Sequence, residues 1–228
     1  MKRVTGTILA TATALAAILL STGVVAQSPA LPADVDPQSF SRLPFVQRDQ
    51  LSGDDLAVFD RLSGKDQAGN RRPLSPGVVS LSLHSPGAAV PLDELHAYLT
   101  RSPVGPAMFQ IAALVATREF DEPFNWNAHE GGALRAKVDQ RTIDAIKFNR
   151  AVEGLPDKDA LVIRFGRALF REHTVSPELY AQVVTAFGKQ GLIDLTAIMG
   201  DYALVDLMMR AVDQHVPNAT YPLPALAR

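Results

Sequence analysis

The sequence predicts an all-α protein folded as a helical bundle. Apolar residues recur at three- and four-residue intervals, the segments with this spacing begin and end at residues that favour helix boundaries, and no β pattern of real length follows residue 72. The chain has 228 residues, of which 47% are hydrophobic and 20% charged, so it can bury the core of one compact domain. We expect that domain to span residues 51–215.

The N-terminal segment has the pattern of a secretory signal. Lys2 and Arg3 precede an uncharged, apolar run over residues 4–26, and a polar, proline-bearing segment follows at once. We expect cleavage after Ala26, because small residues precede this position; the alternative is an uncleaved membrane anchor, since the run is almost long enough to span a bilayer. Cleavage implies an exported protein, periplasmic or extracellular, with no stable membrane association. Residues 27–50 are then predicted to form an extended, proline-rich leader.

Boundary residues predict the first helices. Ser52 can cap a helix whose apolar residues recur at helical spacing, while the basic, glycine-bearing segment 64–72 is predicted to be a loop. Pro91 precedes a second helical stretch, and Pro106 restarts the chain before a third, which has an apolar face. The helices expected here are 52–62, 93–99 and 107–119.

The C-terminal half contains the clearest boundary signals. Ser176, Pro177 and Glu178 place a capping residue, a first-turn proline and a first-turn acid in order. Pro156 likewise precedes apolar residues at helical spacing, and Gly200 would allow a neighbour to approach the last helix closely. The helices expected here are 157–172, 177–188 and 190–213, followed by a non-helical tail, 216–228, that could reach another subunit.

Charge and cysteine content exclude several functions. Loss of residues 1–26 would remove two of the 22 Lys and Arg residues and none of the 24 Asp and Glu residues, leaving 20 against 24, a formal charge of −4. That balance gives no electrostatic support for binding nucleic acid. Because the chain has no cysteine, disulfides, cysteine-rich metal sites and thiol catalysis are excluded, and stability must come from helix packing and oligomerisation.

His129 is the first candidate for chemistry. A neutral imidazole can exchange a proton with a bound organic acid near working pH, and Asn125 and Trp126 share its helix face as the i−4 and i−3 neighbours. Glu130 points about 100° away from His129 on a helix. An aromatic plane, an amide and an imidazole suit a small, flat, oxygen-rich ligand. The alternative is a partly buried histidine bonded to a backbone carbonyl beside a tryptophan that only packs.

The other histidines give weaker signals. His84 precedes a proline-bearing segment and is either a pocket residue or an ordinary loop histidine, whereas His96 and His173 have the pattern of surface helix residues and His215 lies near the tail. No two histidines lie at i and i+4, so the zinc motif of that spacing is absent and no metal is expected. Nucleophile-elbow, phosphate-loop and dinucleotide-binding motifs are absent as well.

Several ordered fragments resemble a known family. Residues 124–130 read Phe-Asn-Trp-Asn-Ala-His-Glu, small residues follow, and a new helix start lies within 138–146; His84-Ser85-Pro86 precedes them. This order over residues 75–215 resembles the carboxymuconolactone decarboxylase-like family of the alkyl hydroperoxidase D-like superfamily. The resemblance implies an all-α fold built around a helical hairpin, assembly as a trimer or hexamer, and pockets near subunit contacts.

The resemblance implies one of two chemistries. One branch of the family reduces peroxides with a Cys-x-x-Cys pair, whose positions here are Glu122 and Asn125, so that route is excluded. The other decarboxylates a lactone without a cofactor, but two of its carboxylates correspond here to Gln110 and Asn125, and an amide cannot accept a proton at neutral pH. If catalysis survives, Gln110 and Asn125 would donate hydrogen bonds to the oxyanion and His129 would deliver the proton.

The predicted function is therefore cofactor-independent acid–base or lyase chemistry, of carboxy-lyase type, on a small lactone or unsaturated carboxylic acid. The residues expected to bind the substrate are Trp126, Glu130, His84 and Tyr202. The alternative is a non-catalytic oligomeric protein that binds a small molecule or acts as a scaffold. A His129 ring open to a cavity on which Asn125 and Gln110 converge would favour the enzyme, whereas a ring sealed in packing would favour the alternative.

Overall fold

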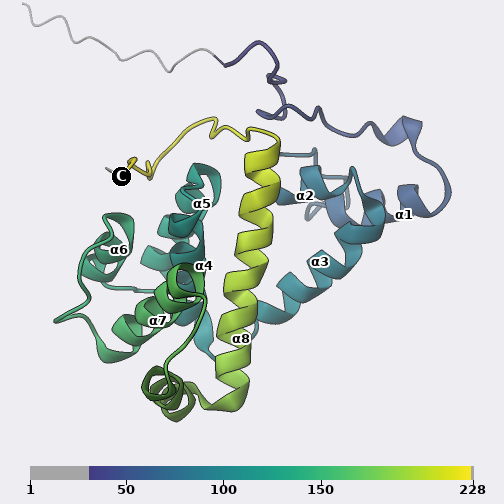
Figure 1. Cartoon of the computed structure of the whole chain (residues 1–228). Coiled ribbons are helices and arrows are strands. Elements are labelled where there is room, and N and C mark those ends of the chain that lie inside the picture. Colours follow the sequence, from purple (N-terminus) through teal and green to yellow (C-terminus); the bar gives the residue numbers. More distant parts are fainter. Residues whose placement is uncertain (1–30, 227–228) are drawn as a thin grey trace, which may run out of the picture. The chain divides into compact units, whose positions relative to one another are not determined.

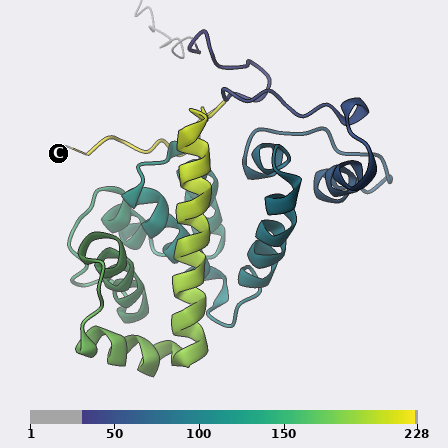
Figure 2. The same cartoon turned by 45° about the vertical axis from the view of Figure 1, so that its right-hand side comes forward.

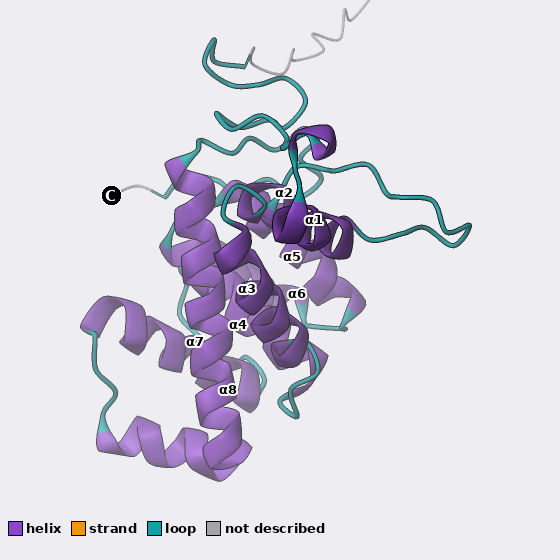
Figure 3. Ribbon diagram, turned by 90° about the vertical axis from the view of Figure 1, so that its right-hand side faces the viewer, coloured by secondary structure: helices purple, strands orange, loops and turns teal. Residues whose placement is uncertain are grey.

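The computed structural model describes residues 31–226 of the chain, and the predicted signal segment lies outside these residues. In the described part the protein contains helices, turns and two isolated β-bridges but no strand, which confirms the all-α prediction (Figure 3). Short 3₁₀ and π turns occur at Arg48–Gln50 and Ala168–Glu172. The helices are α1 (Gly53–Ser63), α2 (Val78–Ser82), α3 (Pro86–Leu99), α4 (Gly105–Glu119), α5 (Pro123–Arg135), α6 (Gln140–Lys147), α7 (Asp157–Arg167) and α8 (Pro177–Ala211).

Helix α8 lies between two groups of helices. Figures 1 and 2 show α4, α5, α6 and α7 on one side of α8, and α1, α2 and α3 on the other. Helix α4 is the centre of the larger group, because α5, α6, α7 and α8 all contact it and residues 111–116 are at most 2% exposed. Burial of apolar side chains on every face of α4 provides the main stabilisation of this core.

Helices α4 and α5 form a helical hairpin. The chain reverses between them at Asp121, whose φ of 50° lies in the left-handed region that favours tight turns. Glu122 then caps α5, since its side chain accepts a hydrogen bond from the backbone N–H of Asn125 at 2.7 Å, and Pro123 occupies the first helical position. This local start fixes the residue at which α5 begins.

Most predicted helices are present, with two differences in their bounds. Helix α3 begins at Pro86 rather than near residue 93, because Pro91 lies inside the helix without ending it. The predicted helix 157–172 is α-helical only as far as Arg167, after which the chain continues as the π turn. The short helix α2 was not predicted from the sequence.

The two helices predicted over 177–188 and 190–213 are two arms of α8. Gly188 has a φ of 72° and a ψ of 175°, so the helix bends there, as Figure 2 shows at its lower end. Glycine adopts this conformation without the steric cost that a Cβ would bring. The predicted cap is confirmed, because Ser176 Oγ accepts a hydrogen bond from the N–H of Leu179 at 3.2 Å.

The segments before and after the helical domain are bound to it. In the leader, the N–H of Arg42 donates to Val212 O at 2.8 Å, and the N–H of His215 donates to Phe40 O at 2.7 Å. In the tail, the N–H of Tyr221 donates to the side-chain oxygen of Asn127 at 2.8 Å. The tail therefore lies on α5 of its own chain (Figure 1). Within residues 31–226, no helix combines the length and the apolarity needed to cross a membrane.

Candidate functional site

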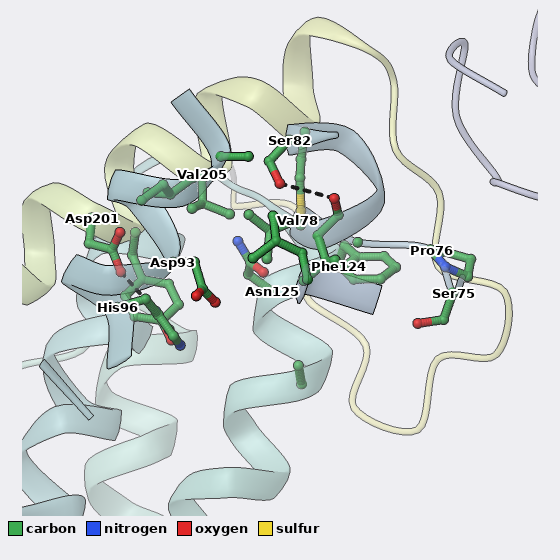
Figure 4. Close-up of a pocket in the computed structure, with 18 of the residues that line it drawn as sticks. Ser75, Pro76, Val78, Ser82, Asp93, His96, Phe124, Asn125, Asp201 and Val205 are labelled. Atoms are coloured by element: carbon green, nitrogen blue, oxygen red, sulfur yellow. Dashed lines mark hydrogen bonds and ion pairs between the residues drawn. The ribbon is translucent and has the colours of Figure 1, made fainter. Parts of the chain in front are cut away.

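A cavity of about 340 Å³ lies between α2, α3, α5 and α8. Its wall is largely apolar, with Phe124, Val78 and Val205 among the side chains drawn in Figure 4. A mostly apolar wall with a few polar groups is the usual composition of a small-molecule site. The polar side chains that line it are Ser75, Ser82, Asp93, His96, Asn125, His129, Asp201 and Tyr202.

His129, on α5, is half-buried and has one ring nitrogen left for the cavity. Its Nδ1 lies 2.8 Å from Gln110 Oε1, and because a carbonyl oxygen can only accept, Nδ1 carries the proton and Nε2 keeps its lone pair. Burial, with smaller effects of the His96 and Arg135 charges, lowers the pKa of His129 from 6.5 to about 3. His129 is therefore a neutral hydrogen-bond acceptor towards a ligand in the cavity.

The side chain of Gln110 packs against Gly132 where it contacts His129. A Cβ built on Gly132 would lie 2.7 Å from Gln110 Oε1, closer than real Cβ contacts come. The amide of Gln110 thus occupies space that only glycine leaves open. Gln110 is not among the residues that line the cavity, so it orients His129 and does not itself face a ligand.

His96 forms a second imidazole site with Asp201. His96 Nδ1 on α3 lies 2.9 Å from Asp201 Oδ2 on α8, and Figure 4 shows the two side chains together at one side of the cavity. The Asp201 side chain is 1% exposed and that of His96 is 44% exposed. His96 is therefore not the plain surface residue that its sequence context indicated, because its partner lies 105 residues away in the chain.

Tyr202 lies between the two histidines. Its ring centroid is 4.5 Å from that of His129 and 6.0 Å from that of His96, with the rings in edge-on contact. Burial raises the pKa of Tyr202, so its hydroxyl stays protonated and can donate a hydrogen bond. Tyr202, which the sequence predicts to bind the substrate, lines this cavity.

Asn125 lines the cavity, and a buried acid, Asp206, fixes its side-chain amide. Its Nδ2 donates to Asp206 Oδ1 on α8 at 2.6 Å, and Asp206 is completely buried. Burial raises the pKa of Asp206 from 3.8 to about 7, although the Asn125 bond opposes that shift. The arrangement fixes the orientation of the Asn125 amide, which keeps one N–H for a ligand.

Trp126 and Glu130, both expected to bind substrate, lie away from the cavity. Trp126 is 0% exposed, and its Nε1 donates to Glu130 Oε2 at 2.5 Å. Lys147 Nζ donates to the same carboxylate oxygen at 2.8 Å, so the acid is satisfied inside the α5–α6 packing. Neither residue is among those that line the cavity, and the pair holds helices together.

The remaining candidate, His84, is also outside the cavity. His84 is exposed, and its Nε2 lies 3.0 Å from the carbonyl oxygen of Pro44 in the leader. Across residues 31–226, no group of three or more His, Asp or Glu side chains is placed to hold a metal ion.

The fold has a relative among solved structures. The chain is similar to the alkylhydroperoxidase AhpD core of an uncharacterized peroxidase-related protein from Ralstonia eutropha JMP134, with a TM-score of 0.62 and 16% identity. The similarity covers 78% of this chain and 93% of that one. No family model and no curated protein sequence matches the chain. The chain therefore has the alkylhydroperoxidase D-like fold, which agrees with the fold that the sequence resemblance implied.

Proposed function

We propose that the protein performs cofactor-independent acid–base chemistry, of lyase type, on a small lactone or unsaturated carboxylic acid. The observation that supports this is a pair of imidazoles on one cavity, His129 and His96, each with Nδ1 committed to a second side chain. Both Nε2 atoms are then left for a bound molecule. Fixed imidazoles of this kind are the usual carriers of protons in enzymes.

The remaining polar side chains of the cavity suit a negative charge that develops on an oxygen atom. Tyr202 and Asn125 offer neutral donors whose orientation is fixed by packing and by Asp206. Donors held in place before the reaction stabilise an enolate without reorganisation. Gln110 has another role than the predicted one, because its oxygen accepts from His129 and it orients the ring.

Thiol-based peroxide reduction is not available to this chain. The sequence contains no cysteine, and the two positions that correspond to a Cys-x-x-Cys pair hold Glu122 and Asn125. Glu122 caps α5, and Asn125 is bound to Asp206. The similarity to a peroxidase-related structure thus supports the fold and not that activity.

We further propose that the protein is exported and self-associates. Export rests on the N-terminal signal pattern, and self-association rests on apolar side chains that α8 exposes. Helix α8 exposes three large aliphatic side chains, Ile193, Leu204 and Leu207, at 63%, 49% and 54%. Large exposed apolar residues gathered on one helix are typical of an interface between subunits, and the family resemblance implies a trimer or hexamer.

The function is tested by turnover of a panel of small lactones and unsaturated carboxylic acids, with products identified by mass spectrometry. We expect His96→Ala to reduce turnover by about 100-fold or more, the range of a lost acid–base group, and His129→Ala to reduce it as well because the cavity loses a hydrogen-bond acceptor. His173→Asn is the matched control, because His173 is exposed and has a φ of 55°, which asparagine tolerates. Absence of turnover, or turnover indifferent to His96→Ala and to His129→Ala, would favour the non-catalytic binding or scaffold protein.

A further inference from the structure

The cavity offers hydrogen-bond acceptors but no cationic side chain. Within the described residues no Lys or Arg lines it, whereas Asp93 and Asp201 both do. Asp201 Oδ1 is buried without a hydrogen-bond partner, and His129 offers only a lone pair. Asp93 is paired with Arg61 at 3.4 Å, outside the lining. A carboxylate bound here would find no cationic side chain on the wall and would face the unpartnered Asp201 oxygen, so the lining favours an uncharged ligand.

An uncharged carbonyl compound fits the same lining. Its oxygen can accept hydrogen bonds from the Tyr202 hydroxyl and from the free N–H of Asn125, and its apolar part can contact Phe124 and Val205. Neither contact brings a charge into the cavity. The cavity volume of about 340 Å³ accommodates a small ring compound.

The two histidines differ in their capacity to carry a proton. A proton on His96 forms an ion pair with the Asp201 carboxylate, 2.9 Å from Nδ1. A proton on His129 would create a buried cation that is hydrogen-bonded to the neutral amide of Gln110. Burial lowers the pKa of His129 to about 3. His96 is therefore the imidazole whose transferred proton has a carboxylate partner, and His129 is the neutral acceptor.

We infer that the substrate is an uncharged α,β-unsaturated lactone or ketone, and that His96 is the base that moves its γ-proton, with Asp201 as a positioning residue. This inference rests on the proposed acid–base function and narrows its substrate class. His96 Nε2 accepts the proton from the γ-carbon, and the electron pair of that C–H bond is delocalised onto the carbonyl oxygen, giving a dienolate. Return of the proton to the α-carbon yields the β,γ-unsaturated isomer, so no further reactant is consumed.

The test compares two substrates that differ in one charge. β-Angelica lactone is uncharged, and its counterpart carries a carboxylate in place of one methyl hydrogen. Each is incubated with the protein in deuterium oxide, and NMR follows exchange of the γ-proton and formation of the isomer. We expect exchange of the uncharged lactone at a rate at least about ten times that of the carboxylate, since a penalty of about 1.4 kcal/mol already gives this factor.

Variants separate the base from its positioning residue. We expect His96→Gln to lower the exchange rate by about 100-fold or more, and His173→Asn to leave it unchanged. Asp201→Asn should lower the rate at saturating lactone while the half-saturating concentration stays the same, because Asp201 orients His96 and not the lactone. A fold-wide effect of Asp201→Asn would change both quantities and would overturn its positioning role.

The outcomes distinguish this inference from the function on which it rests. Exchange of the carboxylate in preference to the uncharged lactone overturns the substrate class, and exchange lost in His129→Gln but not in His96→Gln overturns the base; both results leave acid–base function intact. If neither compound exchanges its γ-proton, the acid–base function and the role of His96 as its base are both overturned. Histidine side-chain NMR with each compound then decides the substrate class: shifts of His96 and His129 with the uncharged lactone alone support it, and any other pattern overturns it.

Discussion

His129 and Asp206 should make the stability of this protein depend on pH in opposite directions. Burial is the main cause of both pKa shifts, but His129 is a base and Asp206 is an acid. The pKa of His129 falls from 6.5 to about 3, and that of Asp206 rises from 3.8 to about 7. Between about pH 4 and 6.5 the folded state therefore lacks the proton on His129 that the unfolded state binds, and holds one on Asp206 that the unfolded state has lost.

The sign of each contribution follows from these proton counts. A lowered pKa in the folded state gives stability that is present above pH 6.5 and is lost as the pH falls towards 3, which is the case of His129. A raised pKa gives stability that is present below pH 3.8 and is lost as the pH rises towards 7, which is the case of Asp206. In the shared window each contribution changes by about 1.4 kcal/mol per pH unit, with opposite signs.

The His129 and Asp206 contributions are similar in size, so the dependence of wild-type stability on pH shows neither of them. One pKa unit corresponds to about 1.4 kcal/mol, which gives at most about 5 kcal/mol for His129 and about 4 kcal/mol for Asp206. The His129 value is an upper limit, because part of its ring faces the cavity and can be solvated there. We expect the two contributions to cancel largely between pH 4 and 6.5.

Single variants should reveal the two contributions in urea unfolding experiments. Trp126 is the only tryptophan and is 0% exposed, so its fluorescence reports unfolding. As the pH rises from 4 to 6, we expect Asp206→Asn to gain about 3 kcal/mol relative to wild type, and His129→Gln to lose a similar amount. The double variant should give a profile parallel to that of wild type. Profiles of the two single variants with the same sign, or both parallel to wild type, would refute the reasoning.

Three further results are expected. Gly132→Ala forces the Gln110 amide to move, because the new Cβ would lie 2.7 Å from its oxygen, and should therefore not give the gain of about 1 kcal/mol that alanine brings to an open helix position; a gain of that size in urea unfolding would contradict this packing. Leu204→Lys adds charge to the exposed face of α8 and should lower the mass found by sedimentation velocity, whereas an unchanged assembly would place the interface elsewhere. Trp126→Phe removes a donor to buried Glu130 and should lower stability by about 1–3 kcal/mol, which thermal unfolding would detect; a neutral effect would mean that Lys147 alone satisfies the acid.

The helical spacing of residues in the sequence identified one face of the site. Asn125 and His129 are four residues apart on α5, so the spacing placed them on one face, and both line the cavity. The same rule grouped Trp126 with them, but Trp126 pairs with Glu130, its own i+4 neighbour, on the adjacent face. Residues three positions apart on a helix, such as Trp126 and His129, do not point in the same direction. The packing of α4 and α5 decides which of their two faces meets α8.

The sequence by itself determined most of the helices, since caps and prolines such as Ser176 and Pro177 act through neighbouring backbone groups. It also determined the absence of thiol chemistry. Only the tertiary structure decided the site, because the bonds from His96 to Asp201 and from Asn125 to Asp206 join residues 105 and 81 positions apart. Contacts between distant helices, and the burial that alters the pKa values of His129 and Asp206, arise when helices pack and leave no local pattern in the chain.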